Sequence, residues 1–298
     1  MDGALIQPRE TADPFARLAP LAGQLSQASR DSRYDVHALL DWPDELPADG
    51  YWLSPEISTC HGPVWESLAE PERVALTRAE LVHFFSISVD LERELVAEVA
   101  ARIYRPRFSS VSEFLFDFLA EENDHMWLFS EFCRRYAGGL TDTGWQASGA
   151  TRESSAETED LILFGRILIA EELCDWYNRR LAQDERLPEI VRAVNRVHHR
   201  DESRHIAFGR RLIEALAEAA GPEGRREAGA YLARYLDVCV GTLYSPAVYA
   251  AAGLPRPAAV RKQAKASPER IRIDAGLTAR TRKFLTSLDV ISDAAAHG

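Results

Sequence analysis

Two Glu-x-x-His motifs constrain the fold of this 298-residue chain more than any other feature. The first runs from Glu122 to His125 and the second from Glu202 to His205. Residues three apart on a helix share one face, and apolar residues at helical spacing surround both motifs. Each motif therefore puts a carboxylate and an imidazole on a buried helix face. An ionised carboxylate there costs several kcal/mol unless it is paired, and a metal ion is the natural partner.

The rest of the chain shows helical periodicity and no strand-like alternation of any length. Proline, glycine and apolar spacing predict helices over residues 15–29, 72–104, 110–136, 156–183, 188–220, 225–244 and 279–287. Four of these are long and are joined by short or polar connectors, as in an up-and-down bundle. We therefore predict an all-α fold, a four-helix bundle with additional peripheral helices.

This fold would occupy a single domain, residues 1–298. We expect it to divide into an irregular N-terminal layer, a bundle core, and C-terminal helices with a proline-rich, basic connector, at residues 1–70, 72–220 and 223–298. The net charge of −11 argues against a nucleic-acid partner, because phosphate binding needs a basic surface.

Other features of the sequence indicate a soluble protein of the cytoplasm. Its four cysteines lack metal-binding or disulfide spacing, as is usual in a reducing compartment. We expect no signal peptide, because the first residues lack a basic region followed by an apolar one. The longest apolar run, Leu161 to Ala170, contains Arg166 and is too short to cross a membrane.

A bundle with two such motifs needs one more carboxylate from each of two other helices to hold a pair of metal ions. On the helix at 72–104 we choose Glu92, which shares its side with apolar residues. Glu94 and Glu98 belong to a ladder at four-residue steps that we interpret as a solvated face. The helix at 156–183 offers Glu171 and Glu172. This helix is apolar nearly all round, so periodicity does not separate the two.

The full pattern resembles the p-aminobenzoate N-oxygenase family of ferritin-like di-iron enzymes. An acid precedes each motif, Asp201 in the second copy and Glu121 in the first, where the family often has Asp. The more specific feature is His198, four residues before Glu202, where arylamine oxygenases of this kind add a third histidine. The resemblance covers residues 82–216, and the terminal portions resemble nothing familiar.

The resemblance implies a set of metal ligands and their supports. The ligands of two iron ions would be Glu92, Glu122, His125, Glu171, His198, Glu202 and His205, with Glu172 as the alternative to Glu171. Asp201 and Glu121 would each orient a histidine of the opposite motif helix; the alternative is that both are helix-surface acids. No catalytic residue beyond the ligands is expected.

The resemblance also implies an activity. The protein would be a ferritin-like non-haem di-iron monooxygenase, an oxidoreductase of secondary metabolism that activates O₂ with an external reductant. It would N-oxygenate an arylamine-type substrate, free or carrier-bound, toward a hydroxylamine, nitroso or nitro product, and it would be a homodimer. The alternatives are a di-iron C-hydroxylase or desaturase, a ferritin-like ferroxidase, and a purely structural bundle without metal.

Several further residues have two interpretations at this stage. Arg166 could bind a substrate carboxylate or pair with an acid such as Asp160. His199 is turned about 100° away from His198 and is interpreted as an outer residue. The remaining candidates are packed or exposed bystanders in one interpretation and line the site in the other: His61, His83, Phe114, Phe116, Phe118, Trp127 and Phe129.

Overall fold

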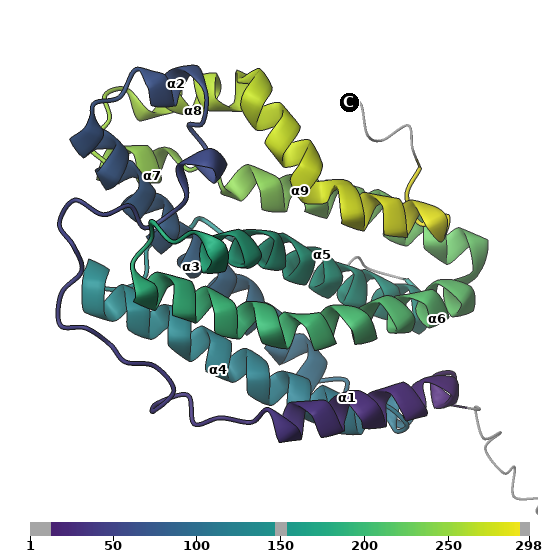
Figure 1. The fold of residues 1–298 in the computed structure, drawn as a ribbon. Helices are drawn as coiled ribbons and strands as arrows, with labels where there is room; N and C mark the ends of the chain where they lie inside the picture. The colour runs from purple at the N-terminus through teal and green to yellow at the C-terminus, as the bar shows by residue number, and fades with distance from the viewer. Residues whose placement is uncertain (1–12, 147–153, 293–298) are drawn as a thin grey trace, which may run out of the picture.

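A computed structural model describes residues 13–146 and 154–292, and this part of the chain is helical without a strand (Figure 1). The predicted all-α fold is confirmed. Three segments of the predicted domain lie outside the described residues: 1–12, 147–153 in a polar connector, and 293–298. No helix within the described ranges is long and apolar enough to cross a membrane.

The bundle consists of α3 (Glu70–Ala100), α4 (Ser112–Ala137), α5 (Ala156–Gln183) and the first part of α6 (Glu189–Thr242). Local signals set the ends of these helices. The Glu72 side chain accepts a hydrogen bond from the backbone N–H of Ala69 (2.8 Å) at the start of α3. Ser155 caps α5, and α4 ends at Gly138, whose φ of 78° suits glycine. The predicted helix at 72–104 ends four residues early, in a turn.

The predicted helices at 188–220 and 225–244 follow each other without a connector, as the two parts of α6. They meet at Gly221, whose φ of 66° interrupts the helical backbone and lets the second part return along α5 (Figure 1). The two helices approach very closely, because a Cβ atom on Gly165 would lie 2.5 Å from Leu232 Cδ1. The glycine at this point of α5 therefore allows the second part of α6 to pack closely over the bundle.

The prediction of a connector before the last helix is wrong, because most of this segment is helical. Residues 246–287 are mostly helical, forming α7 (Pro246–Ala251), α8 (Pro257–Ala266) and α9 (Pro268–Ser287). The prolines that suggested a break each occupy the first position of a helix, where the missing N–H is not needed. The last helix thus begins at residue 268, eleven residues before the predicted start at 279.

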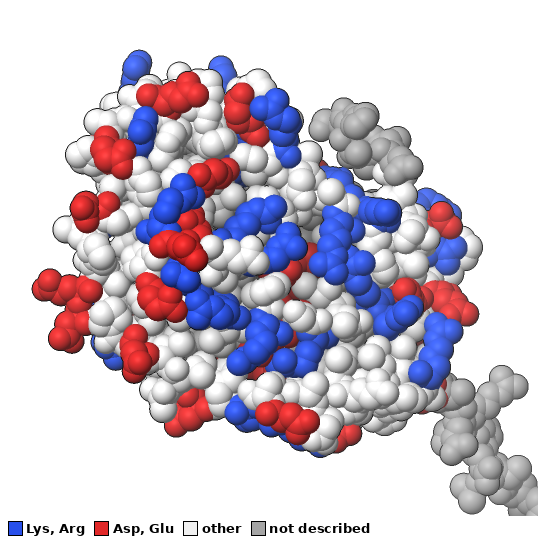
Figure 2. All heavy atoms as spheres, viewed as in Figure 1, with Lys and Arg blue, Asp and Glu red and all other residues white. Residues whose placement is uncertain are grey.

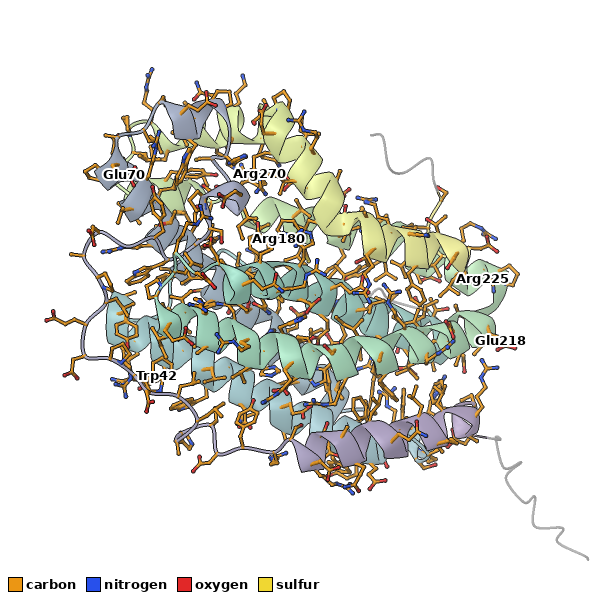
Figure 3. All side chains as sticks on the ribbon, viewed as in Figure 1. Trp42, Glu70, Arg180, Glu218, Arg225 and Arg270 are labelled. Carbon is orange, nitrogen blue, oxygen red and sulfur yellow. The ribbon has the colours of Figure 1, made fainter. Side chains whose placement is uncertain are left out.

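The N-terminal layer contains α1 (Ala19–Asp31), the four-residue α2 (Pro63–Glu66), three short 3₁₀ turns in this layer and the α3–α4 connection, and irregular chain. Arg270, at the start of α9, connects the N-terminal layer with the C-terminal helices (Figure 3). Its fully buried guanidinium donates to the carbonyl oxygens of Ile57 (2.9 Å) and Ser58 (3.2 Å) and to the Tyr244 hydroxyl (3.0 Å). The irregular segment is therefore held by side-chain contacts rather than by regular secondary structure.

Candidate metal centre

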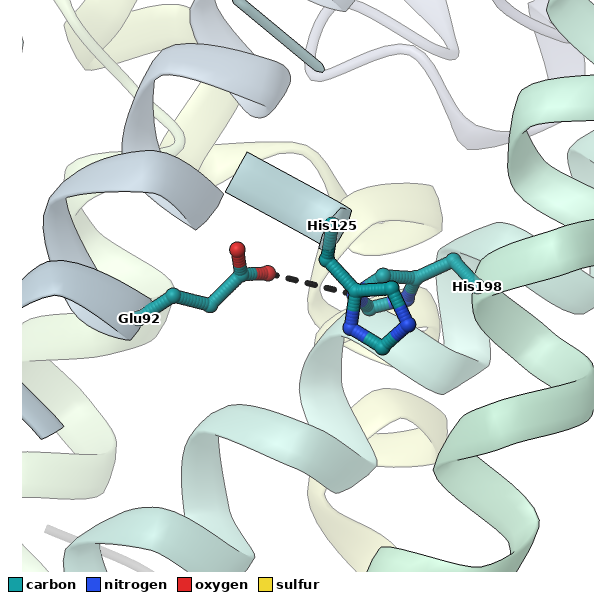
Figure 4. Close-up of side chains that lie close together, drawn as sticks. All are labelled: Glu92, His125 and His198. Atoms are coloured by element: carbon teal, nitrogen blue, oxygen red, sulfur yellow. Dashed lines mark hydrogen bonds and ion pairs between the residues drawn. The ribbon is translucent and has the colours of Figure 1, made fainter. Parts of the chain in front are cut away.

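Seven buried side chains from α3, α4, α5 and α6 converge inside the bundle and form two clusters. The first cluster contains Glu92, His125 and His198, which Figure 4 shows pointing toward one another. The second contains Glu122, Glu171, Glu202 and His205. Within each cluster one possible ligand atom per residue lies within 4.8 Å of the others. All seven ligands implied by the sequence resemblance are thus brought together, and each cluster has a spacing suited to one metal ion.

Two glutamates reach both clusters. Glu122 Oε2 lies 3.6 Å from His125 Nδ1, while its Oε1 lies 2.8 Å from His205 Nδ1. Glu202 Oε1 lies 3.2 Å from His198 Nε2, and its Oε2 lies 3.6 Å from His205 Nδ1. Glu92 Oε1 contacts only the first cluster, 3.1 Å from His198 Nε2. This arrangement suits two carboxylates that bridge a pair of metal ions.

Several atoms that face the clusters have no hydrogen-bond partner among the described residues, although they are buried. They are Glu92 Oε2, Glu122 Oε1, His125 Nδ1, both carboxylate oxygens of Glu202, and His205 Nδ1. Buried polar atoms normally find partners because leaving one unsatisfied costs about 1–3 kcal/mol. Six such atoms in one place are what a metal centre needs, and oxygen and imidazole donors without thiolate suit iron or manganese.

The charges of the clusters would also balance two divalent cations. The four glutamates supply four negative charges when ionised, which equals the charge of two doubly charged ions. Burial raises the pKa of the Glu92 carboxyl well above its usual range, and repulsion from Glu122 raises it further. For His205, burial opposes protonation, but attraction to Glu202 and Glu122 outweighs burial and raises the pKa. Without metal, protons on Glu92 and His205 therefore offset part of the buried negative charge.

Outer carboxylates hold two of the histidines from the opposite helix. His125 Nε2 on α4 lies 3.4 Å from Asp201 Oδ2 on α6, and His205 Nε2 on α6 lies 2.9 Å from Glu121 Oε2 on α4. Each carboxylate accepts the outer N–H, so the Nδ1 atom of each ring faces the clusters. Arg204 donates to both acids, at 2.5 Å from Glu121 and 2.7 Å from Asp201.

Sequence reasoning missed three residues around this centre. Arg204 contacts both outer acids. The Tyr34 hydroxyl in the N-terminal layer donates to Asp201 Oδ2 (2.9 Å), and no local pattern could show this contact. Asn178 contacts His198 Nδ1. Its position seven residues after Glu171, two turns along the same helix face, was the available signal.

The structure separates the two adjacent glutamates of α5. Glu171 lies in the second cluster, with Oε2 3.8 Å from His205 Nδ1. Glu172 points away from it and accepts hydrogen bonds from Arg210 Nε (2.8 Å) and from the Thr281 hydroxyl (2.5 Å). An ion pair with Arg210 and a hydrogen bond from Thr281 thus link Glu172 of α5 with α6 and α9.

Arg166 is occupied by two carboxylates, which argues against a substrate role. It donates to Glu98 Oε1 (2.8 Å) and contacts Glu94, while Asp160 pairs with Arg102 instead (2.9 Å). The suggested Arg166–Asp160 pair is therefore wrong. The interpretation of the ladder as a simple solvated face is wrong as well, because Glu94 and Glu98 bind a buried arginine of the neighbouring helix.

The other three candidate histidines lie outside both clusters. His83 donates from Nε2 to the Thr242 carbonyl (2.8 Å), and His61 Nδ1 lies 3.2 Å from the Pro55 carbonyl. His199 pairs with Asp175 and is about one-third exposed. These contacts account for the three residues without any role at the metal centre.

Three of the candidate phenylalanines border the site, and the most distant is Phe114, whose ring lies 6.4 Å from that of His205. The Phe118 ring lies 4.6 Å from the His205 ring, and the Phe129 ring lies 4.9 Å from that of His198. Phe116 is 47% exposed, and Trp127 packs against Trp42. The apolar rings of Phe118 and Phe129 therefore help to keep water from two of the three histidines.

A surface cavity of about 420 Å³ lies toward one end of α3. Its lining includes Trp52, Arg78, His83 and Tyr136, and none of the seven clustered residues. His83 and Glu92 are nine residues apart, which is about 14 Å along a helix. The chemistry of the buried clusters therefore does not take place in this cavity.

Fold and site together define a class of protein, the ferritin-like bundles that build a dinuclear metal centre from carboxylates and histidines of four helices. A family model described as p-aminobenzoate N-oxygenase AurF matches residues 19–289, and the chain belongs to this family. The protein is thus an oxidoreductase. The match also includes most of the terminal portions that resembled nothing familiar in the sequence.

Solved structures support the fold. The chain is similar to an R2-like ligand-binding oxidase with an aerobically reconstituted Mn/Fe cofactor (TM-score 0.56, 13% identity, 98% of this chain and 99% of that chain). It is also similar to an R2-like ligand-binding oxidase with an aerobically reconstituted metal cofactor after photoconversion (TM-score 0.55, 15% identity, 92% and 93%). No curated protein matches the sequence. At these identities the likeness shows a shared fold.

Proposed function

We propose that this protein is a non-haem di-iron N-oxygenase that uses O₂ and an external reductant to oxidise the nitrogen of an arylamine-type substrate. The observation that carries the proposal is the place of His198 in the first cluster, where its Nε2 atom lies 3.1 Å from Glu92 and 3.2 Å from Glu202. A third imidazole at this position distinguishes the centre from one built by the two Glu-x-x-His motifs alone. Family membership supports the same reaction.

The clustered residues have separate tasks in this proposal. Glu92, His125 and His198 would hold one iron, Glu171 and His205 the other, and Glu122 and Glu202 would bridge them. Two ferrous ions held side by side would supply the electrons that activate O₂. Asp201 and Glu121 keep the proton of each outer histidine nitrogen away from the metal side.

The overall reaction fixes what else the enzyme needs. An amine, O₂, two electrons and two protons give a hydroxylamine and water, so each oxygenation consumes two external electrons. Further rounds on the same nitrogen would lead to the nitroso and nitro products. The substrate is a small amine, free or carrier-bound, and the proposal includes a homodimer, which measurement of the solution mass tests.

A basic face supports an acidic protein as the electron donor. Arginine and lysine side chains gather over α5, α6 and α9 (Figure 2), although the chain carries a net charge of −11. On α6, Arg196, Arg200 and Arg211 are exposed, and the same helix carries three of the clustered residues. Charge reversal of Arg196 and Arg211 should slow reduction by an acidic donor, with Arg93→Glu on α3 as the control. Equal rates in all three variants would remove the donor from this face.

Metal analysis and product analysis test the function. After anaerobic ferrous loading we expect two irons per chain, and with O₂, reductant and a panel of arylamines we expect oxygen on nitrogen by mass spectrometry. His198→Ala should lose iron and N-oxygenation. His199→Ala is the matched control, because that neighbouring ring pairs with Asp175 outside the clusters.

Each alternative predicts a different result. Oxygen added only to carbon would favour a C-hydroxylase, and removal of hydrogen without oxygen addition would favour a desaturase. Iron oxidation and accumulation without organic product would favour a ferroxidase. Well under two metal ions per chain would refute the dinuclear centre, and full activity of His198→Ala would refute the role of the third histidine.

A further inference from the structure

The three clustered histidines differ in the partner that holds the outer ring nitrogen. His125 and His205 face the carboxylates of Asp201 and Glu121, which when ionised only accept hydrogen bonds. The outer nitrogen of His198, Nδ1, instead faces the side-chain amide of Asn178. His198 also presents Nε2 to the cluster, whereas the other two rings present Nδ1.

Asn178 is built into the core and has one unused end. It is fully buried, and its Nδ2 group contacts His198 Nδ1. Its Oδ1 atom has no hydrogen-bond partner among the described residues. The two ends of an amide occupy nearly the same space, so a half turn of the side chain exchanges a donor for an acceptor. Asn178 can therefore serve either protonation pattern of a neutral His198 ring.

We propose that Asn178 is a positioning residue for His198 and that its amide turns over when the first cluster binds metal. Without metal, Nδ2–H donates to Nδ1, so the ring proton is on Nε2. There it is donated to Glu92 Oε1 at 3.1 Å. This carboxylate oxygen therefore has a partner while no cation is bound.

The turn of the amide follows from what a metal ion needs. Nε2 must offer a lone pair, so its proton leaves to solvent and a proton from solvent arrives at Nδ1. The ring stays neutral, and the proton balance of His198 is zero. Asn178 Oδ1 then accepts from Nδ1–H, while its NH₂ group gives up the contact with the ring. The inference rests on the proposed metal site, since His198 would otherwise keep one tautomer.

The neutral amide also distinguishes His198 from the other two rings. A carboxylate that accepts the outer N–H makes an imidazole a stronger metal donor. Asn178 brings no such charge, so His198 is the histidine whose bond to metal depends least on charge and most on geometry. Loss of such an outer partner typically costs about 10–100-fold in metal affinity.

Long-range ¹H–¹⁵N NMR of histidine-labelled, full-length protein tests the inference without turnover. Spectra of the metal-free and zinc-loaded forms report which ring nitrogen carries the proton, and His198→Ala assigns the signal. For the unaltered protein we expect the proton on Nε2 without metal and on Nδ1 with zinc. Asn178→Asp, whose carboxylate only accepts, should place the proton on Nδ1 in both forms.

A second variant and a control separate positioning from packing. Asn178→Leu keeps the volume without a hydrogen bond and should weaken zinc binding about 10–100-fold. Asn195→Leu is the control, because Asn195 is also fully buried but bonds the Val191 carbonyl (2.7 Å). It should leave the His198 proton in place.

Two results would overturn the inference. One is the same His198 tautomer with and without zinc. The other is a metal-free Asn178→Asp spectrum identical to that of the unaltered protein. If no zinc binds, the proposed function fails, and the comparison of the two metal-free proteins still decides whether Asn178 positions His198.

Discussion

Replacing Glu92 with glutamine should stabilise the metal-free protein while removing the stabilisation that metal provides. Glu92 is 6% exposed, and its Oε2 atom has no hydrogen-bond partner among the described residues. Burial and the repulsion of Glu122 raise its pKa, so its ionised form is unfavourable without a cation. Glutamine has the same shape but carries no charge.

The magnitude follows from burial and chain length. A buried, unsatisfied polar group costs about 1–3 kcal/mol and a charged one costs more. Glutamine removes only this excess due to charge, which we take as about 1–3 kcal/mol. At about 2.1 cal/mol/K per residue, the 298 residues give an unfolding entropy of about 0.6 kcal/mol/K. Metal-free Glu92→Gln should therefore melt about 2–5 °C higher. Metal at about 100 times Kd stabilises by about 2.7 kcal/mol per site, or about 4 °C, and the variant should lose this gain at the first cluster.

Thermal unfolding with a chelator and with excess Mn²⁺ measures both effects. The matched control is Glu80→Gln, a glutamate of the same helix that is 5% exposed but binds Ser58 and Thr59 outside the clusters. This control should keep the full metal-dependent rise.

The pH dependence of the Glu92→Gln gain has a definite sign. The folded pKa of Glu92 is raised, so its penalty exists only above the unfolded pKa, which is about 4.3. The advantage of the variant should therefore vanish below about pH 4. A metal-free variant that melts lower than the unaltered protein at pH 7, or that gains as much from Mn²⁺, would refute the reasoning.

Three further outcomes follow from contacts described above. Arg204→Leu leaves Glu121 and Asp201 without their shared partner and should lower the free energy of unfolding by about 3 kcal/mol in chemical denaturation. The control Arg211→Leu removes an exposed ion pair with Glu214 and should change stability by under about 0.5 kcal/mol. Equal effects of the two substitutions would contradict this. Gly229→Ala would put a Cβ atom 1.7 Å from the Val290 carbonyl oxygen, so proteolysis near residue 290 should become faster, and an unchanged cleavage pattern would argue against that packing. Metal uptake at neutral pH should release protons because the pKa values of His125 and His205 are raised; affinity should increase with pH, and calorimetry in buffers of different ionisation enthalpy measures the release.

Helical periodicity was sufficient to predict which residues face the core where a helix has only one buried side. On α4 and α6 the spacing of apolar residues predicted that Glu122, His125, Glu202 and His205 face the core, and the structure places them there. On α5 every residue from Leu161 to Cys174 is buried, so the apolar pattern could not show which side of the helix faces the clusters. Glu172 is distinguished from Glu171 by Arg210 and Thr281, which are 38 and 109 residues away in the chain.

The helices α7 and α8 and the first part of α9 were missed for a local reason. Proline both ends helices and begins them, and the sequence around Pro246, Pro257 and Pro268 was interpreted only in the first sense. Capping by Ser245 and Ser267, directly before two of these prolines, was the signal that favoured the second. The contact between Tyr34 and Asp201 joins irregular chain to a bundle helix, and short-range patterns contain no information on it.

The guanidinium of Arg204 connects the outer acids of the two clusters. It contacts Glu121, which holds His205 of one cluster, and Asp201, which holds His125 of the other. A cation in one cluster should strengthen the hydrogen bond between the histidine and the outer acid of that cluster. The contact of Arg204 with this acid then changes, and so does its contact with the other acid. Loading should therefore be cooperative rather than independent, and the linkage must be equal in both directions. One partly buried side chain of α6 would then decide whether half-filled centres accumulate.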